Sequence, residues 1–381
     1  MKNDFIKLAI LMLSITAISS CSSNVDEQKN EIPKYRLSTS ATYIINEGVE
    51  GNQIAGSLTV IDNKTWTTSQ NMFASVNKRS LGLTPNDAII YGNKMYIAVS
   101  AENTIEVVDK NTLKSIMQIK TTNLLGKDRG QTPRCLVGAG KYIFVTTYSG
   151  YVAAIDTATF ALKNVYQVGA YPEGIDQNNG VLYVANSNLA KGNGSISEIE
   201  LSSGKVTNLT NPLIQNPISV KTFANDLYVL DSGLYDPNNN YNQTGASVLK
   251  ISHGNMTKLM DATMMAIRCK DGKPSKIYTI NAPYTIPATP ISYQVYDCTT
   301  AQSKTFTTTY VDSPAAMAVD SVTGYVYITS YKVNPDWGYA DFSAPGFVNV
   351  YDENGQLLKT MDVGVGPTTI VFNYLNVPAT I

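Results

Sequence analysis

A short apolar stretch built around a tyrosine recurs seven times, and this repeat constrains the fold more than any other feature of the chain. Successive copies are 41 to 53 residues apart, and most follow a proline that begins another apolar stretch. Repeats of this length indicate that one supersecondary unit is used several times, because such a unit cannot bury its apolar face alone. The seven tyrosines are Tyr43, Tyr96, Tyr142, Tyr183, Tyr228, Tyr278 and Tyr327.

Each unit contains four short segments that favour β-strands. In the second unit they cover residues 86–91, 94–100, 104–109 and 115–120, separated by turn-forming pairs such as Gly92-Asn93. β-Branched and aromatic residues dominate these segments, and no long stretch has helical periodicity. Four-stranded units at this spacing predict an all-β fold, namely a seven-bladed β-propeller.

The two ends of the repeat region complement each other. Residues 367–372 have the pattern of a first strand that no further strand follows, whereas the N-terminal unit has later strands but no first strand. We therefore expect the C-terminal strand to complete the N-terminal blade, which closes the ring and removes free sheet edges. The predicted organisation is a signal peptide over residues 1–20, a flexible tether over 21–40 and one propeller over 41–381.

The N-terminal segment has the features of an export signal. Lys2 and Lys7 form a positively charged segment before an apolar run over residues 8–18. This run is too short to span a bilayer comfortably. The sequence ISSC at residues 18–21 resembles a bacterial lipobox, which implies cleavage before Cys21 and lipidation of its thiol. An ordinary secretory signal followed by a chance cysteine is the alternative.

Two repeated features are interpreted as structural rather than catalytic. The third strand of most units ends in an acid, as at Asp62, Asp109 and Asp156, and several continue as Asp-x-x-Thr. An aspartate that accepts backbone N–H bonds tightens such turns. The repeated tyrosines share one structural position, so we expect them to pack blade against blade.

The loops expected on one face are long and aromatic. In antiparallel blades the loops after the second and fourth strands emerge on the same side, here called the top, and the other turns lie at the bottom. The top loops 233–245, 282–290 and 331–346, in adjacent blades five to seven, are enlarged. Their aromatic side chains either pack the loops together or bind a ligand. The aromatic candidates are Tyr235, Tyr241, Tyr284, Tyr331, Trp337, Tyr339 and Phe342.

Polar candidates lie where strands reach the same face. Most residues three positions after the repeated tyrosines are polar, and Arg134 and Glu173 directly follow the prolines of blades three and four. Some of these side chains should satisfy nearby backbone groups, and others could contact a ligand with amide or phosphate groups. The polar candidates are Asn46, Asn186, Asp231, Asn281, Arg134 and Glu173.

Scarce cysteine and histidine limit the chemistry. Cys269 and Cys298 should end two strands at the bottom of blade six, so we predict a disulfide between them, with unbonded thiols as the alternative and Cys135 as a free buried thiol. The only histidine, His253, falls in a bottom turn, so we expect no metal site and no catalytic residue. With a net charge of −1, the chain has no basic surplus for nucleic acid.

The chain resembles the YncE-like propeller lipoproteins of Bacteroidetes. The resemblance is carried by YIINEG at 43–48, TIEVVD at 104–109, LYVANS at 182–187 and the lipobox. It implies a lipid-anchored outer-membrane protein, and the early Asp26-Glu27 pair is similar to the signal that sends such lipoproteins to the cell exterior. Within that family, surface lipoproteins bind vitamin B12 (cobalamin) and related corrinoids and pass them to a TonB-dependent outer-membrane transporter.

The resemblance therefore implies a monomeric lipoprotein that binds a corrinoid on its aromatic top face and requires no cofactor. A protein- or glycan-interaction propeller without a small ligand is the alternative, because propellers are common docking platforms. An enzyme is a third interpretation, which the single histidine disfavours.

Overall fold

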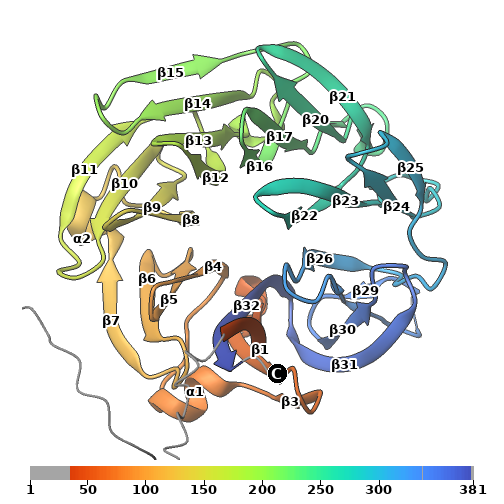
Figure 1. Ribbon diagram of the computed structural model, residues 1–381, viewed down its shortest axis with the longest axis horizontal. Helices are drawn as coiled ribbons and strands as arrows, with labels where there is room; N and C mark the ends of the chain where they lie inside the picture. The colour runs from red at the N-terminus through yellow and green to blue at the C-terminus, as the bar shows by residue number, and fades with distance from the viewer. Residues whose placement is uncertain (1–34, 337, 379–381) are drawn as a thin grey trace, which may run out of the picture.

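The chain forms a ring of seven antiparallel four-stranded sheets, the blades of a β-propeller (Figure 1). The computed structural model describes residues 35–336 and 338–378. In each blade the first strand lies near the centre of the ring and the fourth lies at the perimeter (Figure 1). The predicted fold class and blade number are confirmed.

Blade 1 is assembled from both ends of the described chain. Its innermost strand is β32 (Pro367–Pro378), which pairs antiparallel with β1 (Tyr35–Asn46) over the whole length of β1. β2 (Ser57–Asp62) and β3 (Thr67–Ser69) complete the sheet, so the predicted closure of the ring is confirmed.

The propeller begins earlier than residue 41. Residues 35–40, predicted as part of the tether, belong to β1 and pair with the end of β32 as a two-stranded ribbon at the bottom of the ring. Because the pairing partner lies at the other end of the sequence, local polarity gave no sign of this strand.

Blades 2 to 4 follow one plan, with short turns at the bottom and longer connections at the top. The strands predicted for blade 2 agree with the observed ones to within one residue. Blade 2 contains β4 (Pro85–Tyr91), β5 (Lys94–Val99), β6 (Thr104–Asp109) and β7 (Ser115–Lys120). Blade 3 contains β8 (Pro133–Ala139), β9 (Tyr142–Thr147), β10 (Tyr151–Asp156) and β11 (Leu162–Gln167). Blade 4 contains β12 (Pro172–Asn178), β13 (Val181–Asn186), β14 (Ser195–Glu200) and β15 (Val206–Leu209).

Blades 5 and 7 each carry an additional two-stranded hairpin in the top loop between their second and third strands. The strands are β16 (Pro217–Phe223), β17 (Asp226–Asp231), β18 (Leu234–Asp236), β19 (Asn242–Thr244), β20 (Ser247–Ser252) and β21 (Asn255–Asp261) in blade 5; β22 (Met264–Lys270), β23 (Lys273–Asn281), β24 (Ser292–Asp297) and β25 (Gln302–Thr305) in blade 6; β26 (Pro314–Val319), β27 (Val326–Ser330), β28 (Lys332–Val333), β29 (Ala340–Asp341), β30 (Pro345–Tyr351) and β31 (Leu357–Val365) in blade 7.

In the described part of the chain, helical structure is confined to four short segments in top loops. They are the 3₁₀ turns η1 (Glu50–Asn52) and η2 (Asn188–Ala190) and the helices α1 (Met72–Asn77) and α2 (Thr121–Leu125). Within residues 35–336 and 338–378, no helix combines the length and hydropathy needed to cross a bilayer.

The repeated aromatic position packs each blade against the next. Tyr43, Tyr96, Tyr228, Tyr278 and Tyr327 are at most 3% exposed, which confirms their predicted packing role. Blade 1 illustrates the arrangement, because Tyr43 lies in an apolar cluster that includes residues of blade 2.

Blade 3 departs from the predicted tyrosine register. Phe144, on the second strand, is 2% exposed and pairs with Ala154 on the third strand. The repeated tyrosines of the other blades pair with the third strand at the same position, so the choice of Tyr142 was wrong by two positions. The residue that ends this strand at the top is consequently Thr147 rather than Val145. β9 contains two aromatic residues, Tyr142 and Phe144, two positions apart. Sequence spacing alone did not show which of them occupies the repeated position.

The repeated acids cap turns, as predicted. Oδ1 of Asp109 accepts the backbone N–H groups of Asn111 at 3.0 Å and Thr112 at 2.8 Å. These bonds stabilise the charged carboxylate, with the Thr112 N–H contributing most, and they lower the pKa of Asp109 below its ordinary value. The same arrangement recurs at Asp62, Asp156 and Asp297.

The predicted disulfide is not formed, and Cys135, Cys269 and Cys298 are all free thiols. Cys269 lies on β22 and Cys298 directly follows β24, and β23 separates these two strands in the sheet. Two strand spacings amount to about 9–10 Å, whereas disulfide-bonded cysteines have Cα atoms about 4.4–6.8 Å apart.

We expect three alkylated cysteines when the chain covering residues 35–381 is unfolded in denaturant without reductant and treated with iodoacetamide. Mass spectrometry of the intact chain gives the count. A chain that gains two further adducts only after reduction would contain the Cys269–Cys298 bond and would contradict the structure.

Candidate functional site

A cleft of about 610 Å³ opens on the top face between the enlarged loops of blades 5, 6 and 7. Its volume is within the range of small-molecule pockets, about 300–1,000 Å³. Four of the seven aromatic candidates line it, so the structure brings this part of the predicted set together. They are Tyr235, Tyr284, Tyr331 and Phe342.

One wall of the cleft is formed by the β18–β19 hairpin of blade 5 and the 282–290 loop of blade 6. The N–H of Gln243 donates to the carbonyl of Tyr284 at 2.7 Å, and the N–H of Tyr284 donates to Oε1 of Gln243 at 3.0 Å. Nε2 of Gln243 also donates to the carbonyl of Ser232 at 2.8 Å. Because Gln243 is 8% exposed, its amide fixes the position of Tyr284 from within the wall.

The opposite wall comes from blade 7. Tyr331 follows β27, Phe342 follows β29, and their rings meet edge to face with centroids 4.7 Å apart. Burial raises the pKa of the Tyr331 phenol, and the nearby Glu47 carboxylate raises it further. Phe342 is 58% exposed, so most of its ring remains available for contact.

The cleft combines an apolar base with a few polar groups. Met264 and Pro314, at the inner ends of blades 6 and 7, contribute apolar surface, while Ser232, Asp312 and Ser313 contribute hydroxyl and carboxylate groups. Such a surface can hold a largely apolar molecule and orient it through a small number of hydrogen bonds.

The remaining aromatic candidates do not line this cleft. Tyr241 and Tyr339 are 61% and 77% exposed and lie outside it. Trp337 lies outside the described residues, as do Cys21 and the predicted signal peptide.

Three polar candidates at the ends of second strands, Asn46, Asn186 and Asp231, are buried and hydrogen bonded within the scaffold. Nδ2 of Asn46 donates to Oγ1 of Thr59 at 3.0 Å, and Nδ2 of Asn186 donates to Oγ of Ser197 at 2.9 Å. Asn46 and Asn186 are at most 1% exposed, so we assign them to the architecture of their blades.

Asp231 stabilises the start of the hairpin that forms the first wall. Its carboxylate is 1% exposed and accepts the N–H groups of Gln215 at 2.8 Å and Gly233 at 2.9 Å. Burial raises the pKa of Asp231, and these bonds oppose the shift. Asn281 is half-buried at the end of β23.

Arg134 and Glu173 form a polar cluster with Tyr148 near the ring centre. Nη2 of Arg134 lies 2.9 Å from Oε2 of Glu173, and its guanidinium carbon lies 4.6 Å from the Tyr148 ring centroid. The Tyr148 hydroxyl donates to Oε1 of Glu173. Arg134 and Glu173 neutralise each other's charge. The cluster can therefore form hydrogen bonds with a ligand but presents no net charge to it.

Glu47 is a half-buried acid whose charge interacts with both Arg134 and Tyr331. Burial raises the pKa of its carboxyl group, and the positive charge of Arg134 opposes that shift. The Glu47 carboxylate also raises the pKa of the Tyr331 phenol, after the larger effect of burial. Sequence analysis selected its neighbour Asn46 instead.

Sequence reasoning missed several residues of the cleft and of the central cluster. Gln243 and Asp312 belong to no repeated position, and Tyr148 follows β9 in the blade whose register was misassigned. Glu47 could have been identified, since it is a charged residue directly after the end of a second strand.

His253 does not contribute to this cleft. It occupies the bottom turn between β20 and β21, as predicted, with a φ of 48° in the left-handed region. Among the described residues, no group of three histidine, cysteine, aspartate or glutamate side chains is arranged to hold a metal ion.

Comparisons with known proteins support the fold and leave the ligand open. A family model described as a domain of unknown function, DUF5074, matches residues 40–373. No curated protein matches the chain. Solved structures with similar folds include a candidate 6-phosphogluconolactonase from Bacteroides fragilis, with 13% identity and a TM-score of 0.58, covering 88% of this chain and 98% of that one.

Two further structures are similar to a comparable degree. A candidate 6-phosphogluconolactonase from Bacteroides uniformis has 11% identity and a TM-score of 0.57, covering 87% of this chain and 99% of that one. Hydrazine synthase of Kuenenia stuttgartiensis has 14% identity and a TM-score of 0.58, covering 78% and 96%. At these identities the similarity establishes the propeller fold alone.

Proposed function

The chain belongs to the DUF5074 family, and from that premise we propose that it is a lipid-anchored surface protein that binds a corrinoid on its top face. The proposed ligand is cobalamin or a related corrinoid, delivered to a TonB-dependent outer-membrane transporter. The observation that carries the proposal is the cleft of about 610 Å³ between two aromatic walls.

The chemistry of a corrinoid suits this face. A corrinoid is a large, flattened macrocycle with an apolar surface and a fringe of amide groups. Tyr284 and Phe342 offer exposed aromatic area for the macrocycle, and aromatic side chains provide such area at low conformational cost. Asp312 and the hydroxyl groups of the cleft can pair with ligand amides.

The position of Tyr35, the first described residue, is compatible with a lipid anchor at Cys21. β1 begins at Tyr35 on the bottom ribbon, on the side of the ring away from the cleft. A membrane tether attached there leaves the top face free for a ligand and for a transporter in the outer membrane.

Cyanocobalamin should bind the wild-type chain at micromolar concentration or tighter in isothermal titration calorimetry. Tyr284→Ala removes an aromatic side chain from one wall and should weaken binding about 10- to 100-fold, as expected for an aromatic contact of about 1.5–3 kcal/mol. Gln243→Ala should weaken binding through loss of Tyr284 positioning.

Tyr35→Ala serves as the matched control, because Tyr35 is an exposed tyrosine on the bottom ribbon. Its affinity should equal that of the wild type. Absence of cyanocobalamin binding by the wild type at micromolar concentration would refute the corrinoid proposal and favour a protein- or glycan-interaction propeller. Unchanged affinity in Tyr284→Ala would place the ligand elsewhere.

A role in catalysis is not part of the proposal. Two similar structures are described as candidate lactonases, but no described histidine lies in the cleft, and its one lining acid, Asp312, has no partner acid or base there.

A further inference from the structure

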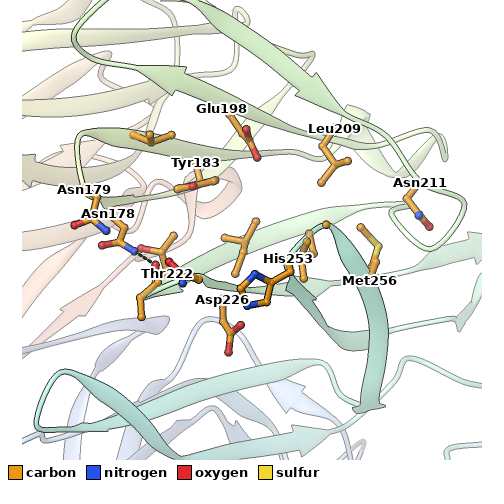
Figure 2. Close-up of a pocket in the computed structure, with 16 residues that line it drawn as sticks. Asn178, Asn179, Tyr183, Glu198, Leu209, Asn211, Thr222, Asp226, His253 and Met256 are labelled. Carbon is orange, nitrogen blue, oxygen red and sulfur yellow. Dashed lines mark hydrogen bonds between the residues drawn. The ribbon is translucent and has the colours of Figure 1, made fainter.

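A second cavity, of about 440 Å³, runs between blades 4 and 5 (Figure 2). We call it the interblade groove; its walls are formed by β12 to β15 of blade 4 and by β16, β17, β20 and β21 of blade 5. None of its lining residues lines the top cleft, so it is a separate site.

The groove lies where blade 4 departs from a pattern that most other blades keep. The residue paired with the repeated aromatic side chain on the third strand is aliphatic in five blades. In blade 5 it is Lys250, which Asp226 neutralises, and in blade 4 it is Glu198, opposite Tyr183. Tyr183 is correspondingly half-buried, whereas its equivalents are nearly inaccessible. The aliphatic residues are Val60, Val107, Ala154, Val295 and Val350.

A carboxylate at this position disfavours tight packing of the two blades. Burying an unpaired charge is costly, so the blade faces cannot close over Glu198 as they close over valine. The pKa of Tyr183 is raised, first by burial and then by the neighbouring Glu198, which is consistent with the two groups lying side by side.

Three polar side chains in the groove have unused hydrogen-bonding capacity. The Glu198 carboxylate, the Tyr183 hydroxyl and the His253 imidazole have no side-chain hydrogen bond or ion pair within the described part of the chain. Tyr183 and Glu198 project from blade 4 toward the space that His253 borders from blade 5 (Figure 2). Asp226 is instead neutralised by Lys250, whose Nζ lies 2.7 Å from Oδ2.

The remaining lining is apolar and amide-bearing, without any lysine or arginine. Leu227, Ile251 and Met256 provide an apolar surface, and several asparagines surround it. The absence of lysine and arginine from the lining, together with the Glu198 charge, disfavours phosphate and other anions. The lining therefore fits a neutral ligand that has a C–H face and many hydroxyl groups.

We propose that the interblade groove is a saccharide-binding site that accepts one pyranose ring. The Glu198 carboxylate accepts hydrogen bonds from adjacent sugar hydroxyls, while Tyr183 and His253 act as donors and acceptors. The apolar residues pack against the C–H face of the ring. A simple amine would use only Glu198 and leave most of these groups unpaired, which makes it the less complementary occupant.

Glu198→Val tests the site, because valine occupies the equivalent position in four other blades and is compatible with the fold. The chain should show saturation-transfer NMR signals with glucose, galactose or N-acetylglucosamine at millimolar concentration. Glu198→Val should weaken binding of the responding sugar at least 10-fold, as expected for loss of hydrogen bonds to a charged group. Glu200→Gln, two residues along on the same blade and outside the groove, should bind like the wild type.

Two outcomes overturn the proposal. No response to any of the three sugars by the wild-type chain, or equal binding by Glu198→Val, would show that the groove is not a saccharide site. Binding of spermidine that Glu198→Val abolishes, without sugar binding, would identify an amine site instead. Tyr284→Ala should leave sugar binding unchanged, so failure of the corrinoid proposal and failure of this one are distinguishable.

Discussion

A chain truncated after Gly366 should not form the native ring. The truncation removes β32, whose side chains Ile370, Val371 and Phe372 pack in the clusters on either side of blade 1. Losing the burial of Val371 and of the partly buried Ile370 and Phe372 costs at most about 5–9 kcal/mol, which is comparable with a total stability of about 5–15 kcal/mol. Circular dichroism during heating should show no cooperative transition, and size-exclusion chromatography should show an expanded or aggregated chain.

A shorter truncation, after Tyr374, is the matched control. It keeps the three packed side chains and removes only the end of the bottom ribbon, where Leu375 is 37% exposed. Its melting temperature should remain within a few degrees of the wild type. The substitution Val371→Asp should reproduce the effect of the long truncation, because it buries an unpaired carboxylate beside Tyr43. A cooperative, native-like transition in the chain ending at Gly366 would show that closure of the ring is dispensable.

Raising the pH should unfold the protein between about pH 10 and pH 12. Burial raises the pKa of Tyr96, Tyr228, Tyr278 and Tyr327 to about 12 from the ordinary value of 10.0. The folded state therefore holds these protons after the unfolded state has released them. The stability contributed by these four phenols is fully present below pH 10. It is lost as the pH rises through their folded-state pKa values.

The expected loss is comparable with the total stability, which is about 5–15 kcal/mol. Each shift of about two units corresponds to about 2–3 kcal/mol, so four tyrosines together approach about 10 kcal/mol. Far-ultraviolet circular dichroism and tyrosinate absorbance should change together during the titration. Full native dichroism above pH 12 would contradict this account.

Tyr96→Phe is the sharpest variant for this titration. The Tyr96 hydroxyl is buried without a hydrogen-bond partner among the described residues, so its removal should cost little stability at neutral pH. The variant loses one ionisable group and should unfold at a higher pH than the wild type. Tyr35→Phe, at an exposed position, should leave the midpoint unchanged.

The fold could be predicted because its determinants repeat. The tyrosine and acid positions recur in successive blades, so an error at one copy, such as Tyr142 for Phe144, does not alter the blade count. Closure of blade 1 could also be predicted, because residues 367–372 have the pattern of a first strand and no further strand follows them.

The site was only partly predictable because its determinants are unique to single loops. Aromatic composition identified Tyr284 and Phe342, but not the hydrogen bonds of Gln243, which depend on how two loops from different blades meet. Asn46 and Asp231 were selected as possible ligand contacts, whereas both are buried, Asn46 bonded to Thr59 and Asp231 to backbone N–H groups. Whether a polar strand end faces solvent depends on loop conformation, and a single sequence does not define that conformation.

The pairing of β1 with β32 also determines when blade 1 can form during synthesis. Blades 2 to 7 are each built from strands that follow one another along the chain, so each can form as it emerges from the ribosome. Asn46, by contrast, has its partner at Pro367. At a translation rate of about 5–20 residues per second, β1 waits about 15–65 seconds for that partner. During this interval its apolar residues and one strand edge are uncovered, which makes the first strand of the ring the segment most in need of protection by a chaperone.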